Sequence, residues 1–411
     1  MRTMTNRNKV GTAFALGMLL SSTTALAQTT LAPLIQGDDE EYEIDPITVG
    51  ALRVTPQVLA EATYDNNVFA DPDGSELEDV EFILRPELNV QTGNDNLRFD
   101  LDVYGEFSRF ADLSSENSEA YGAAGRFTYG PSATDALSVE AGFARLVEDR
   151  SDPEARNLIG PGPRLIDSTY ANASYNRTGG RTLLSLTAGY RNLDAVSSID
   201  EDRDFETFTG TATVGYRVSG PLFATVTAFA SARDFRLEDT LSGASRDSKT
   251  YGAQLGVSFV ESERFRGRAR LGLFRFDPSN PVADERTGFS ADVSLIYLPT
   301  RRIAVILDAF NGDVATFRGG AQARTDTRVS ATGQFEIRHN LYGRTGVGWS
   351  RNRFIGSGIE QRTLSSNIAV EYLARRRLSL IAQLEVADRS SDDPTEEFDK
   401  FRATLAARIR F

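Results

Sequence analysis

The feature that most constrains the fold of this chain is an alternation of apolar and polar residues that recurs from residue 51 to the end. In the last eleven residues, FRATLAARIRF, one parity carries Phe401, Leu405, Ile409 and Phe411, and the other carries the arginines. Successive side chains of a β-strand point to opposite faces of a sheet, so this stretch predicts a strand with one apolar face. That face could contact either a soluble core or lipid, and one strand leaves both open.

Eighteen such segments can be delimited, and their length of about a dozen residues suits a tilted strand that crosses a bilayer. We place them at 51–64, 80–91, 96–110, 119–129, 135–147, 164–177, 181–192, 205–218, 222–235, 248–260, 265–276, 285–298, 301–312, 324–338, 341–353, 361–373, 378–388 and 400–411. The faces of the sixth and ninth segments are ambiguous.

The connections between these segments alternate strictly in length. Short ones, such as TGG at 178–180, follow long ones, such as the glycine- and proline-rich stretch at 148–163. An outer-membrane barrel keeps this order, because tight turns face the periplasm and longer loops face outward. We therefore predict an all-β fold, a transmembrane antiparallel β-barrel of about 18 strands in the cell outer membrane. The stretch at 148–163 is the best candidate to fold into the barrel, although it could equally stay outside.

The amino terminus has the features of a secretory signal peptide over residues 1–27. A basic start precedes an apolar run, and Ala25 and Ala27 supply the small residues of a cleavage site. Residues 28–50 contain an acidic cluster without a clear period, and we interpret them as a flexible periplasmic lead-in. The barrel is then expected to occupy residues 51–411.

Aromatic residues cluster near the predicted strand ends, as in the two interfacial girdles of membrane barrels. The periplasmic set is Tyr129, Tyr175, Tyr216, Phe259, Tyr297, Tyr372 and Phe411, and the outer set is Tyr64, Phe107, Phe143, Tyr190, Phe310 and Trp349. The last strand is expected to close against the first, which removes exposed sheet edges.

The polar parity of the later strands is rich in arginine and is predicted to face the pore lumen. The residues concerned are Arg266, Arg268, Arg270, Arg324, Arg328 and Arg338, together with Asp292 and Asp308. Lipid cannot hold three arginines on one strand face, since each costs roughly 2–4 kcal/mol near the bilayer midplane. The arginines could select anionic solutes, or they could pair with carboxylates across strands and merely fill a wet interior.

Composition limits the chemistry that this chain could perform. It contains no cysteine and one histidine, His339, in a predicted two-residue turn without a visible nucleophile–base partner. Metal sites of the His/Cys type are therefore excluded by count. We expect no enzymatic activity, no cofactor and no nucleic-acid partner.

The stretch LRVTPQVLAEATYDNNVFA at 52–70, with its YDNN step at Tyr64–Asn67, and the closing FRATLAARIRF resemble the putative beta-barrel porin 2 family of Gram-negative bacteria. The resemblance implies outer-membrane lipid as the surroundings and a final strand, ending in Phe411, that the β-barrel assembly machinery recognises. Some relatives accompany exopolysaccharide export systems, and the family supplies no catalytic residue.

Three functions remain open from the sequence. The first is a porin-like channel for small hydrophilic or anionic solutes. The second is the barrel component of an exopolysaccharide export system, with periplasmic polysaccharide-export proteins as partners. The third is a structural or adhesive surface barrel.

Overall fold

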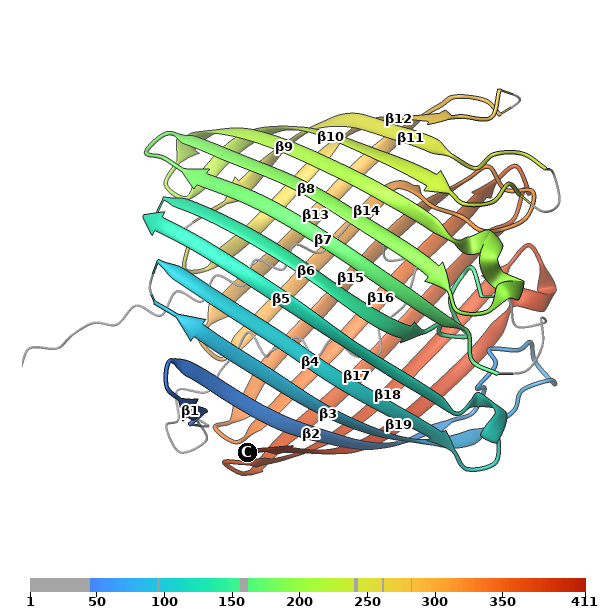
Figure 1. The fold of residues 1–411 in the computed structure, drawn as a ribbon, viewed down its shortest axis with the longest axis horizontal. Helices are drawn as coiled ribbons and strands as arrows, with labels where there is room; N and C mark the ends of the chain where they lie inside the picture. Colours follow the sequence, from blue (N-terminus) through green and yellow to red (C-terminus); the bar gives the residue numbers. More distant parts are fainter. Residues whose placement is uncertain are drawn as a thin grey trace, which may run out of the picture.

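Eighteen antiparallel strands close into a barrel in the computed structural model, which describes residues 45–411 apart from 95, 133, 156–161, 240–242, 261 and 282 (Figure 1). The strands of the ring are β2 (Leu52–Asp65), β3 (Asp79–Gly93), β4 (Leu97–Phe110), β5 (Ser118–Ser132), β6 (Asp135–Val147), β7 (Leu165–Thr178), β8 (Thr182–Ala195), β9 (Phe205–Ser219), β10 (Leu222–Phe235), β11 (Ser248–Phe259), β12 (Phe265–Pro278), β13 (Arg286–Thr300), β14 (Ile303–Val314), β15 (Ala323–Arg338), β16 (Leu341–Ile355), β17 (Glu360–Arg375), β18 (Leu378–Ser391) and β19 (Phe398–Arg410). All eighteen predicted strands are present, and no boundary differs by more than three residues.

The ring closes between the last and first long strands, as predicted. β19 pairs with β2 from Arg402 opposite Asp65 to Arg410 opposite Gln57. The amide of Phe411 adds a hydrogen bond of 3.0 Å to the carbonyl of Pro56. Every long strand therefore has a neighbour on both sides, and no edge remains unpaired.

A short additional strand precedes the barrel. β1 (Ile47–Val49) forms an antiparallel pair with the start of β2. The expectation of an irregular lead-in is therefore wrong for these three residues, because they add to the exposed backbone at the start of β2. The predicted signal peptide, its cleavage site at Ala25 and Ala27, and residues 28–44 lie outside the described residues.

The two ends of the barrel differ, as the alternating connections predict. Connections of two to five residues gather at one end, here the turn end, on the left of Figure 1. The other connections, of which all but the one between β16 and β17 are longer, gather at the opposite end, here the loop end, and include three short 3-10 helices, η1 (Ser114–Glu116), η2 (Ser198–Arg203) and η3 (Pro394–Glu396). This polarity is typical of outer-membrane barrels.

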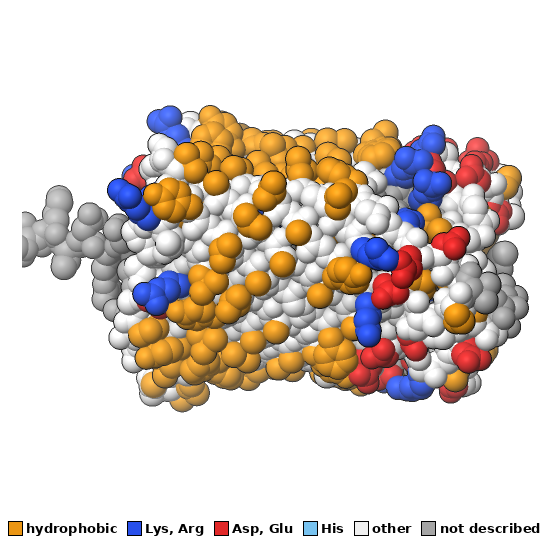
Figure 2. All heavy atoms as spheres, turned by 90° about the horizontal axis from the view of Figure 1, so that it is seen from above, with side chains coloured by type: hydrophobic (Ala, Val, Ile, Leu, Met, Phe, Trp, Pro, Cys, Tyr) orange, Lys and Arg blue, Asp and Glu red, His pale blue; other side chains and the backbone are white. Residues whose placement is uncertain are grey.

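On the face seen in Figure 2, an apolar belt lies between the two ends of the barrel, and charged side chains gather beyond it. Alternation produces the belt, since residues such as Leu255, Leu271 and Leu405 are exposed on the outer face. At the turn end the ring of Phe265 stacks on that of Tyr297 with 4.7 Å between ring centroids. No helix among the described residues has the length and apolarity needed to cross a membrane.

Most of the predicted girdle aromatics are exposed on the outer face. Those with large exposed surface are Tyr64, Phe107, Tyr129, Phe143, Tyr216, Tyr297, Trp349, Tyr372 and Phe411. Phe310 is an exception, and its assignment to the outer girdle is wrong. It shares the parity of Asp308, and the guanidinium of Arg328 lies 5.1 Å from the centroid of its ring.

Candidate functional site

Five of the six arginines predicted to line the lumen lie on strand positions whose parity points inward. On β12, Leu271 and Leu273 are 55% and 59% exposed on the outer face. Arg266, Arg268 and Arg270 have the opposite parity and therefore point inward. On β15 the same alternation, with Val329 exposed outside, directs Arg324 and Arg328 inward, whereas Arg338 follows a register irregularity after Glu336 and is exposed at the end of the strand. We call Arg266, Arg268, Arg270, Arg324 and Arg328 the arginine wall.

Part of the arginine wall is neutralised by carboxylates on the neighbouring strands. Arg268 Nε donates to Asp292 Oδ1 at 2.6 Å. Asp308 lies exposed on the inner face of β14, where Ser294 and Ser330 are its cross-strand neighbours. Arg328 Nη2 lies 3.8 Å from Asp326 Oδ2, a distance that leaves this pair weak.

The rest of the arginine wall carries uncompensated charge. Within the described part of the chain, Arg266 and Arg270 of this wall make no ion pair, and neither does Arg338 at the end of β15. Asp292 is the cross-strand neighbour of Arg270, but its carboxylate bonds Arg268 instead. Two of the unpaired arginines therefore lie on one strand, on either side of a paired one.

An acidic wall faces the arginines from the opposite side of the ring. β3 and β12 are nine positions apart in a ring of eighteen strands, which places them across the lumen from each other. The inner faces of β3 and β4 carry Glu81, Glu87, Asp100, Asp102 and Glu106. Arg85 compensates part of this charge, with Nε 2.7 Å from Glu87 Oε1. The interior is therefore polarised from one wall to the other.

A neutral polar wall on β9 and β10 lies near the arginine wall in the ring, and it was not predicted from the sequence. The inner faces of β9 and β10 carry Thr207, Thr209, Thr211, Thr213, Thr225 and Thr227. Thr213 and Thr227 share a hydrogen bond of 2.9 Å between their hydroxyls. The threonines recur at every second position of FETFTGTATV, and this period of two could have predicted a strand face lined by hydroxyl groups.

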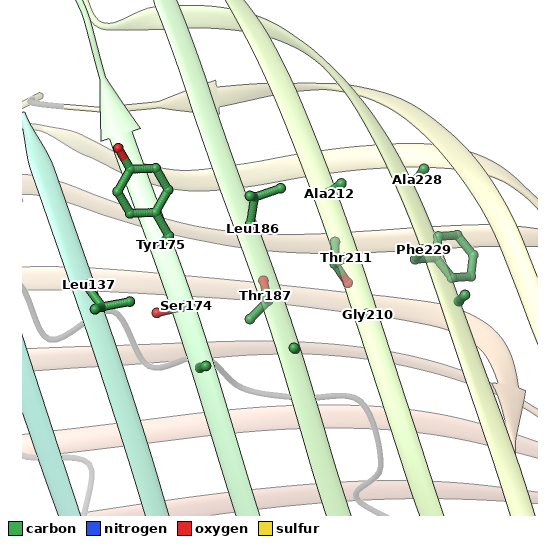
Figure 3. A pocket seen from close by; sticks show the side chains of 13 residues that line it. Leu137, Ser174, Tyr175, Leu186, Thr187, Gly210, Thr211, Ala212, Ala228 and Phe229 are labelled. Carbon is green, nitrogen blue, oxygen red and sulfur yellow. The ribbon is translucent and has the colours of Figure 1, made fainter.

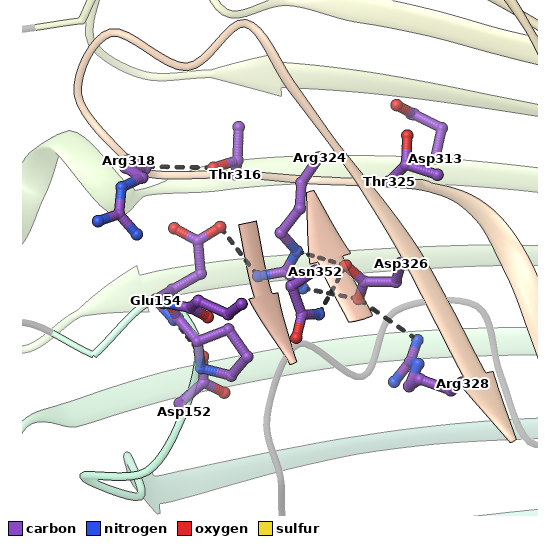
Figure 4. Close-up of polar contacts among 12 residues, drawn as sticks. Asp152, Glu154, Asp313, Thr316, Arg318, Arg324, Thr325, Asp326, Arg328 and Asn352 are labelled. Atoms are coloured by element: carbon purple, nitrogen blue, oxygen red, sulfur yellow. Dashed lines mark hydrogen bonds and ion pairs between the residues drawn. The ribbon is translucent and has the colours of Figure 1, made fainter. Parts of the chain in front are cut away.

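The described residues Glu148–Ala155 of the loop between β6 and β7 fold into the barrel, so the inward alternative holds for this part of 148–163, while 156–161 lie outside the described residues. We call Glu148–Ala155 the strap. β6 and β15 lie nine positions apart in the ring, so a loop leaving β6 must cross the lumen to contact β15. Glu154 of the strap does so, and its Oε1 accepts a bond of 2.9 Å from Arg324 Nη1 (Figure 4).

Several contacts fasten the strap to the far wall. Phe317 N donates to Glu154 Oε2 at 3.0 Å, and Gln361 Nε2 donates to the carbonyl of Pro153 at 3.4 Å. Arg389 donates to the carbonyl of Ser151. These partners belong to three different parts of the far wall, the β14–β15 loop, β17 and β18. The strap is therefore held along its length rather than at a single point.

The ion pair at the centre of this attachment is almost completely buried. The side chains of Arg324 and Glu154 are each 1% exposed. Arg324 Nε also lies 2.8 Å from Asp326 Oδ1, and Asn352 donates to the same carboxylate at 2.9 Å (Figure 4). Arg324 thus lies on the inner face, as predicted, but it is covered by the strap and does not face an open lumen.

A second strap carboxylate is buried without a matching cation. Asp152 Oδ1 accepts a bond of 2.8 Å from the amide of Glu154, whereas Oδ2 has no hydrogen-bond partner among the described residues. Burial and the nearby Glu148 carboxylate raise the pKa of Asp152 to about 7, although Arg324 opposes the shift. Glu148 itself is paired with Arg203 of η2.

Further contacts at the loop end involve β9, β10, η3 and the loop between β14 and β15. The rings of Phe205 and Phe317 lie 5.4 Å apart between centroids, and Phe235 stacks on Phe205. Arg318 of the β14–β15 loop pairs with Glu396 of η3. Contacts between residues so far apart in the chain leave no local sequence pattern.

The outer surface has a shallow depression over β6 to β10 (Figure 3). Its lining includes Leu137, Leu186, Ala212 and Ala228, which belong to the apolar belt. Small outer-face side chains produce the hollow, which suits contact with lipid. In the described part of the chain, no group of three or more His, Cys, Asp or Glu side chains is placed to hold a metal ion.

The residues of the closing strand and the single histidine lie as follows. Phe401, Leu405, Ile409 and Phe411 are exposed on the outer face of β19 or just after it. His339 lies in the two-residue turn between β15 and β16.

The barrel is similar in outline to solved porins. OccK2 (OpdF) of Pseudomonas aeruginosa aligns with a TM-score of 0.47 and 13% identity, over 87% of this chain and 98% of that one. A BenF-like porin of Pseudomonas fluorescens Pf-5 aligns with a TM-score of 0.49 and 12% identity, over 87% and 99% of the two chains. No curated protein matches the sequence.

The family assignment rests on the sequence profile of the putative beta-barrel porin 2 family, which matches residues 40–411. The match spans the whole barrel. The chain therefore belongs to the putative beta-barrel porin 2 family and is a porin-like channel of the outer membrane.

Proposed function

We propose that this channel passes small hydrophilic solutes and favours those that carry a negative charge. The observation that carries the proposal is the pair of uncompensated arginines, Arg266 and Arg270, on the inner face of β12. Basic side chains that line a pore attract anions and repel cations. The acidic wall across the lumen orients a charged solute rather than cancelling the effect, because Arg85 and Arg402 already neutralise part of its charge.

The position of the strap favours a channel for small solutes over an export pore for polymers. It crosses the lumen and contacts β15, β17 and β18, so a solute must pass beside it. Export of a polysaccharide chain, with periplasmic partners, would require the strap to leave the interior. We therefore favour the solute channel over the export component.

Liposome swelling tests the proposal directly. Purified barrel is reconstituted, and swelling is compared in isosmotic sodium gluconate and glucosamine hydrochloride, which are of similar size and opposite charge. We expect faster swelling in gluconate. Equal rates, or faster swelling in glucosamine hydrochloride, would overturn the anion preference, and no swelling in any solute would overturn the open channel.

We further propose that the β-barrel assembly machinery recognises β19 through its outward apolar residues. Phe401, Leu405, Ile409 and Phe411 are between 36% and 69% exposed, so lipid or a partner strand can contact them. The amide of Phe411 also bonds Pro56 and so completes the closure of the ring.

Deletion of Phe411 should slow insertion and expose the chain to periplasmic degradation. The loss removes an aromatic anchor and one closing hydrogen bond. Folded barrel is measured by heat-modifiable gel migration of outer-membrane fractions, with Phe401→Leu as a control that keeps the apolar pattern. Wild-type amounts of folded barrel after the deletion would contradict recognition through Phe411.

A further inference from the structure

Two buried polar atoms without hydrogen-bond partners flank a glycine on the inner face of the barrel. In the register of β10, β11 and β12, Thr225 lies opposite Gly256, and Gly256 lies opposite Arg270. Thr225 is 4% exposed. Within the described residues, neither Thr225 Oγ1 nor Arg270 Nε has a hydrogen-bond partner. Buried polar atoms normally have hydrogen-bond partners, so two buried atoms without a partner in one row need an explanation.

Glycines create the space between these two side chains. A Cβ on Gly256 would lie 2.9 Å from Arg270 Cγ, so the arginine stem lies over the glycine. On the other side of Thr225, a Cβ on Gly215 would lie 3.1 Å from Thr225 Cγ2. The row therefore has a cation at one end and a hydroxyl at the other, and the residue between them, Gly256, has no side chain of its own and is covered by the stem of Arg270.

The surroundings leave Arg270 without a competing anion. The Asp292 carboxylate, its neighbour in the next strand, is engaged by Arg268 Nε and Nη2. In the adjacent row, Gln254 Nε2 reaches over Gly272 and donates to Ser290 Oγ at 2.7 Å. Hydroxyl and amide groups thus border the arginine on the side away from Arg268.

We propose that Arg270 and Thr225 form a subsite for small 2-hydroxycarboxylates. A guanidinium presents parallel donors that match the two oxygens of a carboxylate. The hydroxyl of Thr225, across Gly256, can donate to or accept from the hydroxyl beside that carboxylate. This subsite rests on the proposed anion channel and names the class of solute that it retains.

Block of the chloride current through single barrels in planar bilayers tests the subsite. Lactate and propionate are the probes, since they differ by one hydroxyl. Wild type should be blocked more strongly by lactate than by propionate. Arg270→Gln should weaken block by both probes about tenfold or more, the range expected when a charge-assisted hydrogen bond is lost.

Three further variants separate the subsite from general electrostatics. Arg270→Lys keeps the positive charge but loses the paired donors of the guanidinium. The preference for chloride should therefore persist, while block by lactate weakens. Thr225→Val, which keeps the side-chain shape, should abolish only the difference between lactate and propionate. Arg266→Gln removes an unpaired arginine from the same strand face and should change block by less than about twofold, since that charge lies at a distance and is screened by salt.

The outcomes of this test distinguish the subsite from the channel itself. Equal effects of Arg270→Gln and Arg266→Gln on lactate block would overturn the subsite and leave the anion preference standing. A cation-selective wild type would overturn the proposed function instead. Heat-modifiable migration confirms that each variant is folded before its current is measured.

Discussion

Two groups of charges inside this barrel contrast sharply in their surroundings. At the strap, Arg324 and Glu154 are each 1% exposed and bond to each other, and Asp326 and the amide of Phe317 complete the contacts. On β12, Arg270 is only partly buried and makes no ion pair within the described part of the chain. Arg324 is fully engaged by bonds within the protein, whereas Arg270 can bind a solute.

This difference shows that inward-pointing arginines of one barrel are not equivalent. A buried pair is costly to break, because removing one partner leaves the other charge without water or counter-charge. A half-exposed, unpaired arginine contributes little to stability and raises the local concentration of anions. We therefore expect the strap arginine to control the shape of the lumen and the β12 arginines to control its selectivity.

The largest effect is expected from breaking the strap attachment. Arg324→Met leaves Glu154 and Asp326 buried without their cation, at a cost of about 3–5 kcal/mol. The strap should leave the far wall, and single-channel conductance should rise. Arg338→Met, on the same strand and without a partner, should leave conductance unchanged. An unaltered conductance for folded Arg324→Met would show that the strap does not restrict the lumen.

A smaller effect is expected from the titration of Asp152. Docking keeps its pKa near 7, whereas a free strap exposes the carboxyl to water at its ordinary value of 3.8. The docked form therefore binds the proton more tightly, so docking is strongest at acid pH and weakens as pH rises toward 7. The charged groups around this carboxyl are Glu148, Glu154, Arg203, Arg324, Arg328 and Arg389.

Conductance measured between pH 5 and 8 checks this behaviour. Wild type should conduct more as pH rises to about 7 and then level off. Asp152→Asn cannot ionise and should keep a low, constant conductance over the same range. A variant that retains the wild-type pH dependence would assign the titration to another group.

The sequence predicted the barrel well and its internal contacts poorly, for one physical reason. Alternation and connection length are local, so the eighteen strands and the inward faces of Arg266 and Arg270 could be read directly from the chain. The bond from Arg324 to Glu154 joins residues 170 positions apart, and no local sequence pattern predicts such a contact. The assignment of Phe310 to the outer girdle relied on its position near a strand end. Its parity is that of Asp308, which indicates the inner face.

The smallest but most direct effect concerns selectivity, measured as the reversal potential in planar bilayers under a KCl gradient. Wild type should prefer chloride, more strongly at low salt, where screening is weak. Arg266→Gln with Arg270→Gln should reduce that preference, whereas Arg268→Gln with Asp292→Asn, which removes a neutral pair, should leave it unchanged. A wild type that prefers potassium, or equal shifts in the two double variants, would contradict the division between paired and unpaired arginines.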